Sequence, residues 1–327
     1  MVGHSEQPTS QNGRRTVVPV PPLNSASAAP ARTAPASRGV ALGAGAYVIW
    51  GLVPAYWPFL QPAGSVEVLA HRIAWSLVVM AVITTALHRW SDLRRLSGRG
   101  WLMVTAASVL IAVNWGVYIH AVNTRHVVEA ALGYFINPLV SVLLGVFVLR
   151  ERLRVAQCAA LAVAVAAVVV LAVDYGRLPW ISLVLAGSFG LYGLLKKTVP
   201  LDATASLTAE SAVLAPVAAG YLLWLGPAGT FHDHGWGHAL WLASAGLVTA
   251  VPLIMFGAGA RLVPLATMGM LQYLAPVLQF AWGVFVAHEP MPASRWIGFA
   301  LVWVALVVFT ADAVRGSRRR LPVADPA

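Results

Sequence analysis

The chain has 327 residues, of which 59% are hydrophobic and only 10% are charged, and its formal net charge is +10. Soluble domains are about 25% charged, so this composition excludes a soluble enzyme, a nucleic-acid-binding domain and a disordered scaffold. Uncharged apolar runs at 155–173, 211–232 and 262–288 are each long enough to cross a bilayer, which takes about 20 residues, and they predict an all-α membrane protein.

The first segment, residues 1–38, is rich in Pro, Ser, Thr and Ala and contains no apolar run. This composition is typical of a disordered tail, which we expect in the cytoplasm. Arg14-Arg15 is not followed by the apolar stretch that a twin-arginine export signal requires. The single cysteine, Cys158, excludes an intramolecular disulfide.

Ten apolar segments follow the tail, and each is predicted to be a transmembrane helix. The expected spans are residues 40–60, 65–87, 101–121, 127–149, 155–174, 179–197, 203–225, 238–260, 265–287 and 295–313. Prolines within several of them are tolerated because neighbouring helices satisfy the freed backbone groups. A basic tail at residues 315–327, also expected in the cytoplasm, ends the chain.

The lysines and arginines alternate between the two sides of these spans. With a cytoplasmic N-terminus, all but four of the 22 fall in segments that lie inside; only Arg125, Arg177 and Arg295 lie in outer loops, and Arg72 lies within a span. This bias orients membrane proteins with positive loops inside. We therefore expect both termini in the cytoplasm and the protein in the inner (plasma) membrane of the cell. The same bias explains the net charge of +10 without a nucleic-acid partner.

The two halves of the chain match at a fixed offset of 138 residues. The matching pairs are residues 138–140 with 276–278, residues 145–148 with 283–286 (both Gly-Val-Phe-Val), and Glu151 with Glu289. We therefore expect two repeats, at 39–174 and 175–314. Because each holds five spans, the second copy is inverted, which is the architecture of secondary transporters.

The segment 129–140, Glu-Ala-Ala-Leu-Gly-Tyr-Phe-Ile-Asn-Pro-Leu-Val, resembles the RarD family, which belongs to the EamA-type drug/metabolite transporters. Further matching positions are His71-Arg72, Trp75-Ser76, Asn114-Trp115, residues 189–193 with Lys196-Lys197, Glu210, residues 251–253 and Gln272-Tyr273. The resemblance covers about residues 39–314. It implies two inverted five-helix EamA repeats around a central cavity and export of drugs or metabolites; the tail before Gly39 looks longer than is usual for the family.

Charged side chains inside a bilayer cost roughly 2.5–3.5 kcal/mol and are candidates for function. Arg72 and Glu210 are 138 residues apart and so hold equivalent positions in the two repeats. Two interpretations remain open: a substrate or proton site whose partners exchange during transport, and a fixed ion pair between spans two and seven. His71 also has two interpretations. It could be a functional group that titrates near neutral pH, or a structural histidine at the membrane interface.

Polar and aromatic residues within the spans are candidates for the lining of a substrate cavity. They are Trp50, Asn114, Tyr118, Tyr134, Asn137, Tyr192, Gln272 and Tyr273. For each residue the alternative is a hydrogen bond between helices, worth about 1 kcal/mol. As a group they favour a cavity for amphipathic molecules.

The sequence contains no phosphate-binding loop, so ATP bound to this chain does not drive transport. A proton gradient, exchange or the gradient of the solute supplies the energy. No cofactor, metal site or catalytic constellation is expected. The predicted function is a secondary transporter that exports small amphiphilic molecules, and the alternatives are a passive channel and a membrane-embedded enzyme. The sequence leaves open the solute, the direction of transport, the coupling ion, for which protons are a candidate, and the oligomeric state.

Overall fold

The computed structural model describes residues 33–149, 155–196, 199–260, 262–263 and 265–318. It divides the chain into a short unit, Met1–Thr33, and a unit of Ala34–Ala327 that contains nearly all described elements. All regular elements in the described ranges are helices. They are α1 (Thr33–Tyr56), η1 (Trp57–Leu60), α2 (Ser65–Ala86), α3 (Trp90–Arg94), α4 (Gly98–Asn123), α5 (Val127–Leu149), α6 (Val155–Tyr175), α7 (Trp180–Lys196), α8 (Ala203–Leu225), η2 (Gly226–Ala228), α9 (Thr230–Asp233), α10 (Gly235–Ala260), α11 (Leu265–Leu271), α12 (Leu274–Ala281), η3 (Trp282–Val286) and α13 (Ala293–Arg318).

The helices confirm a multi-pass membrane protein. Eight described stretches are long and apolar enough to cross a bilayer, and two shorter apolar helices lie at Val127–Val140 and Trp180–Lys196. All ten predicted segments are therefore helical where described, but the count of ten crossings stays a prediction. The short helices α3 and α9, at the ends of longer ones, were not predicted.

The predicted ninth span, 265–287, is not one continuous α-helix. It is divided into α11, α12 and the π-helical turn η3, with turn residues at Gln272 and Tyr273. Pro276 has no backbone N–H to donate to the carbonyl of Gln272, and its ring crowds that carbonyl. Both effects favour an interruption directly before α12.

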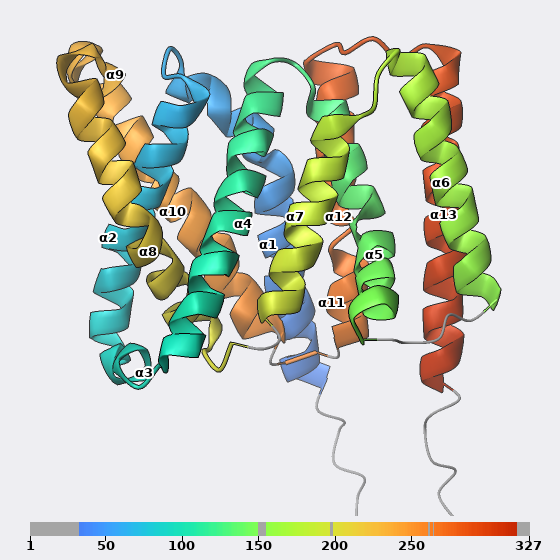
Figure 1. Ribbon diagram of the computed structural model, residues 1–327, viewed down its shortest axis with the longest axis horizontal. Helices are drawn as coiled ribbons and strands as arrows, with labels where there is room; N and C mark the ends of the chain where they lie inside the picture. Colours follow the sequence, from blue (N-terminus) through green and yellow to red (C-terminus); the bar gives the residue numbers. More distant parts are fainter. Residues whose placement is uncertain (1–32, 150–154, 197–198, 261, 264, 319–327) are drawn as a thin grey trace, which may run out of the picture. The chain divides into compact units, whose positions relative to one another are not determined.

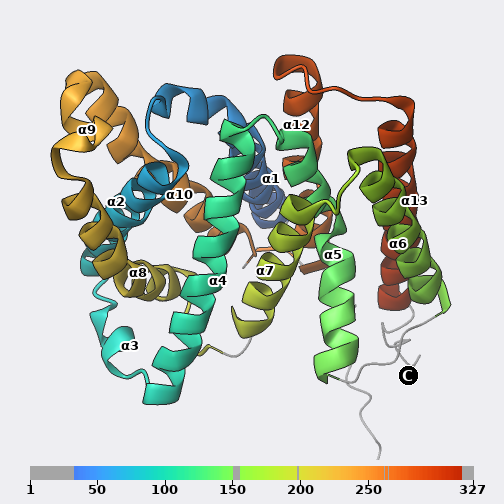
Figure 2. The ribbon, with the colours of Figure 1, turned by 45° about the horizontal axis from the view of Figure 1, so that its top comes forward.

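Three helix contacts join elements that hold equivalent places in the two predicted repeats. These pairs are α2 with α8, α5 with α12, and α6 with α13. Further contacts are made by α2 with α10, α4 with α7, and α5 with α7. Figures 1 and 2 show these helices side by side. This pairing is what two copies related by a twofold axis would give.

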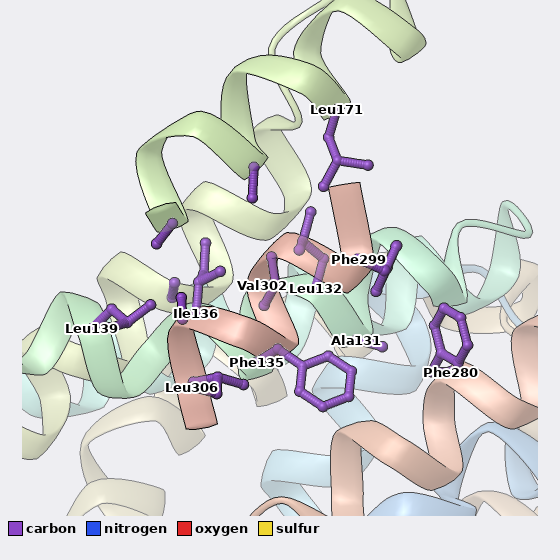
Figure 3. Packing of buried hydrophobic residues seen from close by; sticks show 14 of the residues in the cluster. Ala131, Leu132, Phe135, Ile136, Leu139, Leu171, Phe280, Phe299, Val302 and Leu306 are labelled. Carbon is purple, nitrogen blue, oxygen red and sulfur yellow. The ribbon is translucent and has the colours of Figure 1, made fainter. Parts of the chain in front are cut away.

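The largest apolar cluster lies where α5, α6, α12 and α13 meet. In Figure 3, Leu132 and Phe135 of α5 lie beside Phe299 and Val302 of α13, and Phe280 of α12 completes the group. Inside a bilayer the hydrophobic effect does not drive helices together, so such contacts stabilise the bundle through close van der Waals packing. Glycines bring other helices together: a Cβ on Gly246 of α10 would lie 2.5 Å from the Trp75 carbonyl of α2.

The two ends of the bundle carry different elements. We call the end where α1 begins and α13 ends the terminal end; α3 lies there too (Figure 1). The opposite end carries η1, α9 and the connections at 124–126, 176–179 and 287–292 (Figure 1). The helices thus run alternately between the ends, as expected for a chain that crosses a membrane repeatedly.

Candidate functional site

Arg72 of α2 contacts side chains from three other elements, and two of these side chains are aromatic. Only 8% of its surface is accessible. Its Nε donates a hydrogen bond of 2.9 Å to Thr249 Oγ1 of α10. Its guanidinium carbon lies 4.1 Å from the ring centre of Trp115 of α4 and 5.8 Å from that of Trp57 of η1. Such stacking stabilises a cation by about 0.5–2 kcal/mol.

The charge of Arg72 is not neutralised by an acid in the described part of the chain. No carboxylate there lies within 4.0 Å of it. The ionisable neighbours that interact with its charge are Tyr134, Tyr118 and Tyr56. Tyrosines are uncharged at neutral pH, so this cation has hydrogen-bonding and aromatic partners but no counter-ion.

Glu210 of α8 has partners on α7 and on its own helix. It is 1% exposed. Lys196 Nζ lies 2.7 Å from its Oε1, which also accepts from Ser206 Oγ at 2.8 Å. Tyr192 OH donates to its Oε2 at 3.0 Å. The fixed ion pair between Arg72 and Glu210 is therefore not formed: each binds another partner, and the acid is paired with a lysine at the end of α7.

His71 lies beside a pocket at the opposite end. Its ring stacks on Phe231 of α9, with centroids 4.9 Å apart. The pocket has a volume of about 410 Å³ and is lined by Glu67, His71 and Trp75 of α2 together with the end of α8. Glu67 accepts from Thr230 N at 2.6 Å, which fixes the start of α9.

Asn114 and Tyr134 form a hydrogen-bonded connection between helices. Asn114 Nδ2 of α4 donates to Leu185 O at 3.0 Å and to Ser188 Oγ at 3.1 Å, both on α7. Its Oδ1 accepts from Tyr134 OH of α5 at 3.1 Å. Asn114 therefore has the partners expected of a structural side chain that joins α4, α5 and α7.

Tyr118 and Asn137 differ from that pair because each buries a polar atom without a partner. The hydroxyl of Tyr118 and the Oδ1 of Asn137 have no hydrogen bond to any described residue. Asn137 faces α7, where a Cβ on Gly190 would lie 3.7 Å from that oxygen. A buried polar group without a partner costs about 1–3 kcal/mol, so both are candidates for contact with a solute.

A row of rings connects the surroundings of Arg72 to those of Glu210. It consists of Tyr118, Tyr134, Phe189 and Tyr192, with successive centroids 5.8, 6.2 and 6.0 Å apart. Phe189 was not among the predicted lining residues, although it stands in the segment 189–193 that carries the family resemblance.

The remaining candidates lie elsewhere. Trp50 of α1 packs against Tyr47 and Phe256, and its carbonyl accepts from Gln279 Nε2 at 3.1 Å. Tyr273 packs on the large apolar cluster and interacts with Gln272 and Thr310. Trp50, Gln272 and Tyr273 thus have described partners other than Arg72, and their place in a cavity lining stays a prediction.

An ionic network ties the predicted halves together at the opposite end. Glu129, at the start of α5, is 1% exposed and accepts from Arg177 Nη2 at 2.7 Å and from Ile181 N at 3.2 Å. Glu289 accepts from the backbone N–H groups of Val127, at 2.5 Å, and Val128, at 3.0 Å, which caps α5.

These ion pairs adjoin a cavity of about 240 Å³. Its lining includes Arg125, Tyr175 and Arg295, and Arg295 also pairs with Asp174 at 2.9 Å. The hydrogen bond to Glu129 raises the pKa of Arg177. Burial raises the pKa of Glu289, and its two backbone hydrogen bonds oppose that effect. In the part of the chain that the structure describes, no group of three or more His, Cys, Asp or Glu residues has a metal-binding arrangement.

Sequence reasoning missed Trp57, Trp115, Thr249 and Lys196 as partners of the two intramembrane charges. Trp115 directly follows the candidate Asn114, and Lys196 belongs to the resemblance, so both had a signal in the sequence. Thr249 had none, because it lies 177 residues from Arg72 and is an ordinary residue in an apolar helix.

Comparison with known proteins gives a consistent result. The model of the EamA-like transporter family matches residues 37–173. Protein RarD of Streptomyces exfoliatus is 56% identical over 88% of this chain and 94% of its own length. The uncharacterized transporter YojE of Bacillus subtilis is 43% identical over 86% of this chain and 96% of its own length. One protein crystal structure, 18% identical, matches 85% of this chain and 98% of its own with a TM-score of 0.57, which supports the fold alone.

Proposed function

The chain belongs to the RarD group of EamA-like transporters, and from this membership we propose that it exports a small amphiphilic solute by alternating access. The observation that carries the proposal is the buried guanidinium of Arg72, which contacts Trp115 of the first predicted repeat and Thr249 of the second. Secondary transporters bind their solute where two repeats meet, near the middle of the membrane. Arg72 contacts both predicted repeats, and a buried charge kept there at an energetic cost is explained by a role in transport.

We propose ten crossings in two inverted repeats, 39–174 and 175–314. The helix pairs α2 with α8, α5 with α12 and α6 with α13 support this arrangement. We propose that the protein lies in the plasma membrane with its terminal end toward the cytoplasm. The basic residues Arg94 and Arg95, in and directly after α3, lie at this end, and basic residues favour the cytoplasmic side. Reporters fused after Ser91 and Trp236 should lie on opposite sides; the same side for both would contradict inversion.

Two sets of contacts are the proposed gates. At the opposite end, Glu289 and Arg295 of the second repeat bind Val127 and Asp174 of the first. Toward the terminal end, Thr84 of α2 and Thr208 of α8 share a hydrogen bond of 2.7 Å, and Arg89 pairs with Asp202. In alternating access the first set would break when the solute leaves outward, and the second when it enters.

Solute counterflow in proteoliposomes tests this function against a channel and an enzyme. The solute is chosen by comparing metabolites released by a deletion strain and an overexpression strain. A carrier takes up labelled solute faster when the vesicles contain unlabelled solute, whereas a channel shows no such stimulation. Protein-free vesicles are the control. Equal uptake with and without internal solute would contradict alternating access, and conversion of the solute would indicate an enzyme.

A further inference from the structure

In the part of the chain that the structure describes, Arg72 and three nearby side chains have hydrogen-bond donors without an acceptor. Arg72 donates through Nε to Thr249, and its two terminal nitrogens donate to no described residue. The hydroxyl of Tyr118, the indole nitrogen of Trp57 and the hydroxyl of Ser76 are all buried, again without a partner in the described ranges. Ser76 lies four residues after Arg72 on α2, so both are on one face of that helix.

These donors come from three elements that pack together, α2, η1 and α4. Trp57 of η1 has its ring centre 5.8 Å from the guanidinium carbon, and Tyr118 of α4 interacts with the charge of Arg72. Burying one cation costs several kcal/mol, and each unpaired donor costs about 1–3 kcal/mol more. A single negatively charged group would reduce both costs, because it offers several acceptor lone pairs and a counter-charge.

Resting on the transport function proposed above, we propose that Arg72, Trp57, Ser76 and Tyr118 bind the negatively charged group of the solute, which is therefore a small organic anion. The planar guanidinium has donors placed for two-point binding of a carboxylate or a phosphate. Stacking on Trp115 at 4.1 Å holds the guanidinium plane without using its N–H groups. The aromatic row from Tyr118 to Tyr192, whose successive rings are inclined to one another, offers ring faces and edges for the apolar rest of the molecule.

The full chain, purified in detergent, can be tested with three small probes that carry the same ring. Phenylacetate and phenyl phosphate are anions, and phenylacetamide is a neutral analogue of phenylacetate. We expect at least one anion to raise the melting temperature in a saturable way and the amide to raise it much less. Arg72→Gln should weaken anion binding about tenfold or more, as expected for the loss of charge-assisted hydrogen bonds. Which anion binds distinguishes a carboxylate from a phosphate ligand.

Two further variants keep the test decisive if Arg72→Gln does not fold. Tyr118→Phe removes a hydroxyl that has no partner, so the fold should tolerate it, and anion binding should weaken severalfold. Arg94→Gln removes an equal charge from exposed α3 and should leave anion binding unchanged. Equal response to phenylacetate and phenylacetamide, no response to either anion, or unchanged binding in both Arg72→Gln and Tyr118→Phe would overturn the proposal.

Failure of this inference is distinguishable from failure of the transport function. Counterflow of a solute that proceeds equally in wild type and Arg72→Gln would leave the transporter standing and overturn the anion site. Anion-specific stabilisation that depends on Arg72, in a protein that gives no counterflow, would support the site and contradict the carrier mechanism.

Discussion

Arg72 and Glu210 stand at the same place in their helices, yet the structure treats them differently. Each is the eighth residue of its helix, α2 and α8, and they are 138 residues apart. Glu210 is surrounded by Lys196, Tyr192 and Ser206. Arg72 has aromatic rings and one hydroxyl as partners, but no acid in the described chain.

The difference teaches that equivalent positions in a repeat can have different roles. A buried charge whose partners come from the protein itself is compensated in every state that keeps those contacts. A buried charge without a counter-ion is best compensated when a ligand supplies one. The first arrangement predicts a role in holding α7 to α8, and the second predicts a role in binding.

The largest expected effect is on folding, from breaking the pair at Glu210. Lys196→Met leaves the buried carboxylate of Glu210 without its counter-ion, so it should destabilise the protein by about 3–5 kcal/mol. Glu210→Leu leaves the charge of Lys196, whose side chain is 26% exposed, and should cost less. The double variant should recover much of the loss, because no unpaired charge remains. Melting temperature and yield of monodisperse protein measure this. Two single variants as stable as wild type would remove the structural role of the pair.

Arg72 should behave in the opposite way. Arg72→Met loses the bond to Thr249 and the stacking on Trp115, but it also relieves an unpaired buried charge, so we expect stability within about 1 kcal/mol of wild type. Transport should be lost. Thr249→Val, which removes only one hydrogen bond, should keep part of the transport. A sharply destabilised Arg72→Met would show that the charge has a structural partner.

The cycle that combines Arg72→Met with Glu210→Leu tests whether the two sites are coupled. Their partners are distinct, so the effects on stability should add within about 0.3–0.5 kcal/mol. The same cycle on Lys196 and Glu210 should depart strongly from additivity and serves as the positive control. If Arg72→Met partly rescued the stability of Glu210→Leu, the two residues would be coupled, and the hypothesis that they form an ion pair would be supported again.

Much of the fold was predictable because the signal is local. Each of the ten apolar segments forms helix over most of its described length, since a backbone in a bilayer satisfies its own hydrogen bonds only in a few ways. The break before α12 was not predictable from Pro276 alone, because α5 continues through Pro138. Helices α3 and α9 have five and four residues, too few to show a period.

The site was predictable only in part. Arg72 and Glu210 stand out because charges are rare in apolar spans. Their partners come from helices distant in sequence, and Lys196 ends α7 in a place where a basic residue also fits the positive-inside pattern. Because the positive-inside pattern already explained Lys196, there was no separate reason in the sequence to expect its contact with Glu210. Asn114 and Tyr118, four residues apart, looked alike in sequence, and only the packing separates a bonded side chain from an unbonded one.

The smallest expected effect compares two neighbouring tyrosine hydroxyls. The rings of Tyr118 and Tyr134 are 5.8 Å apart, but only Tyr134 donates a hydrogen bond, to Asn114. Tyr134→Phe should lower stability by about 0.6 kcal/mol, a typical value for such bonds inside membranes. Tyr118→Phe removes a buried hydroxyl that has no partner, so stability should stay equal or rise slightly. Melting curves of the two variants in the same detergent make the comparison. If Tyr118→Phe were the more damaging change in the absence of ligand, the Tyr118 hydroxyl would have a partner in the ligand-free protein. That hydroxyl would then no longer be an unpaired donor, and the argument for an anion site at Arg72 would be weaker.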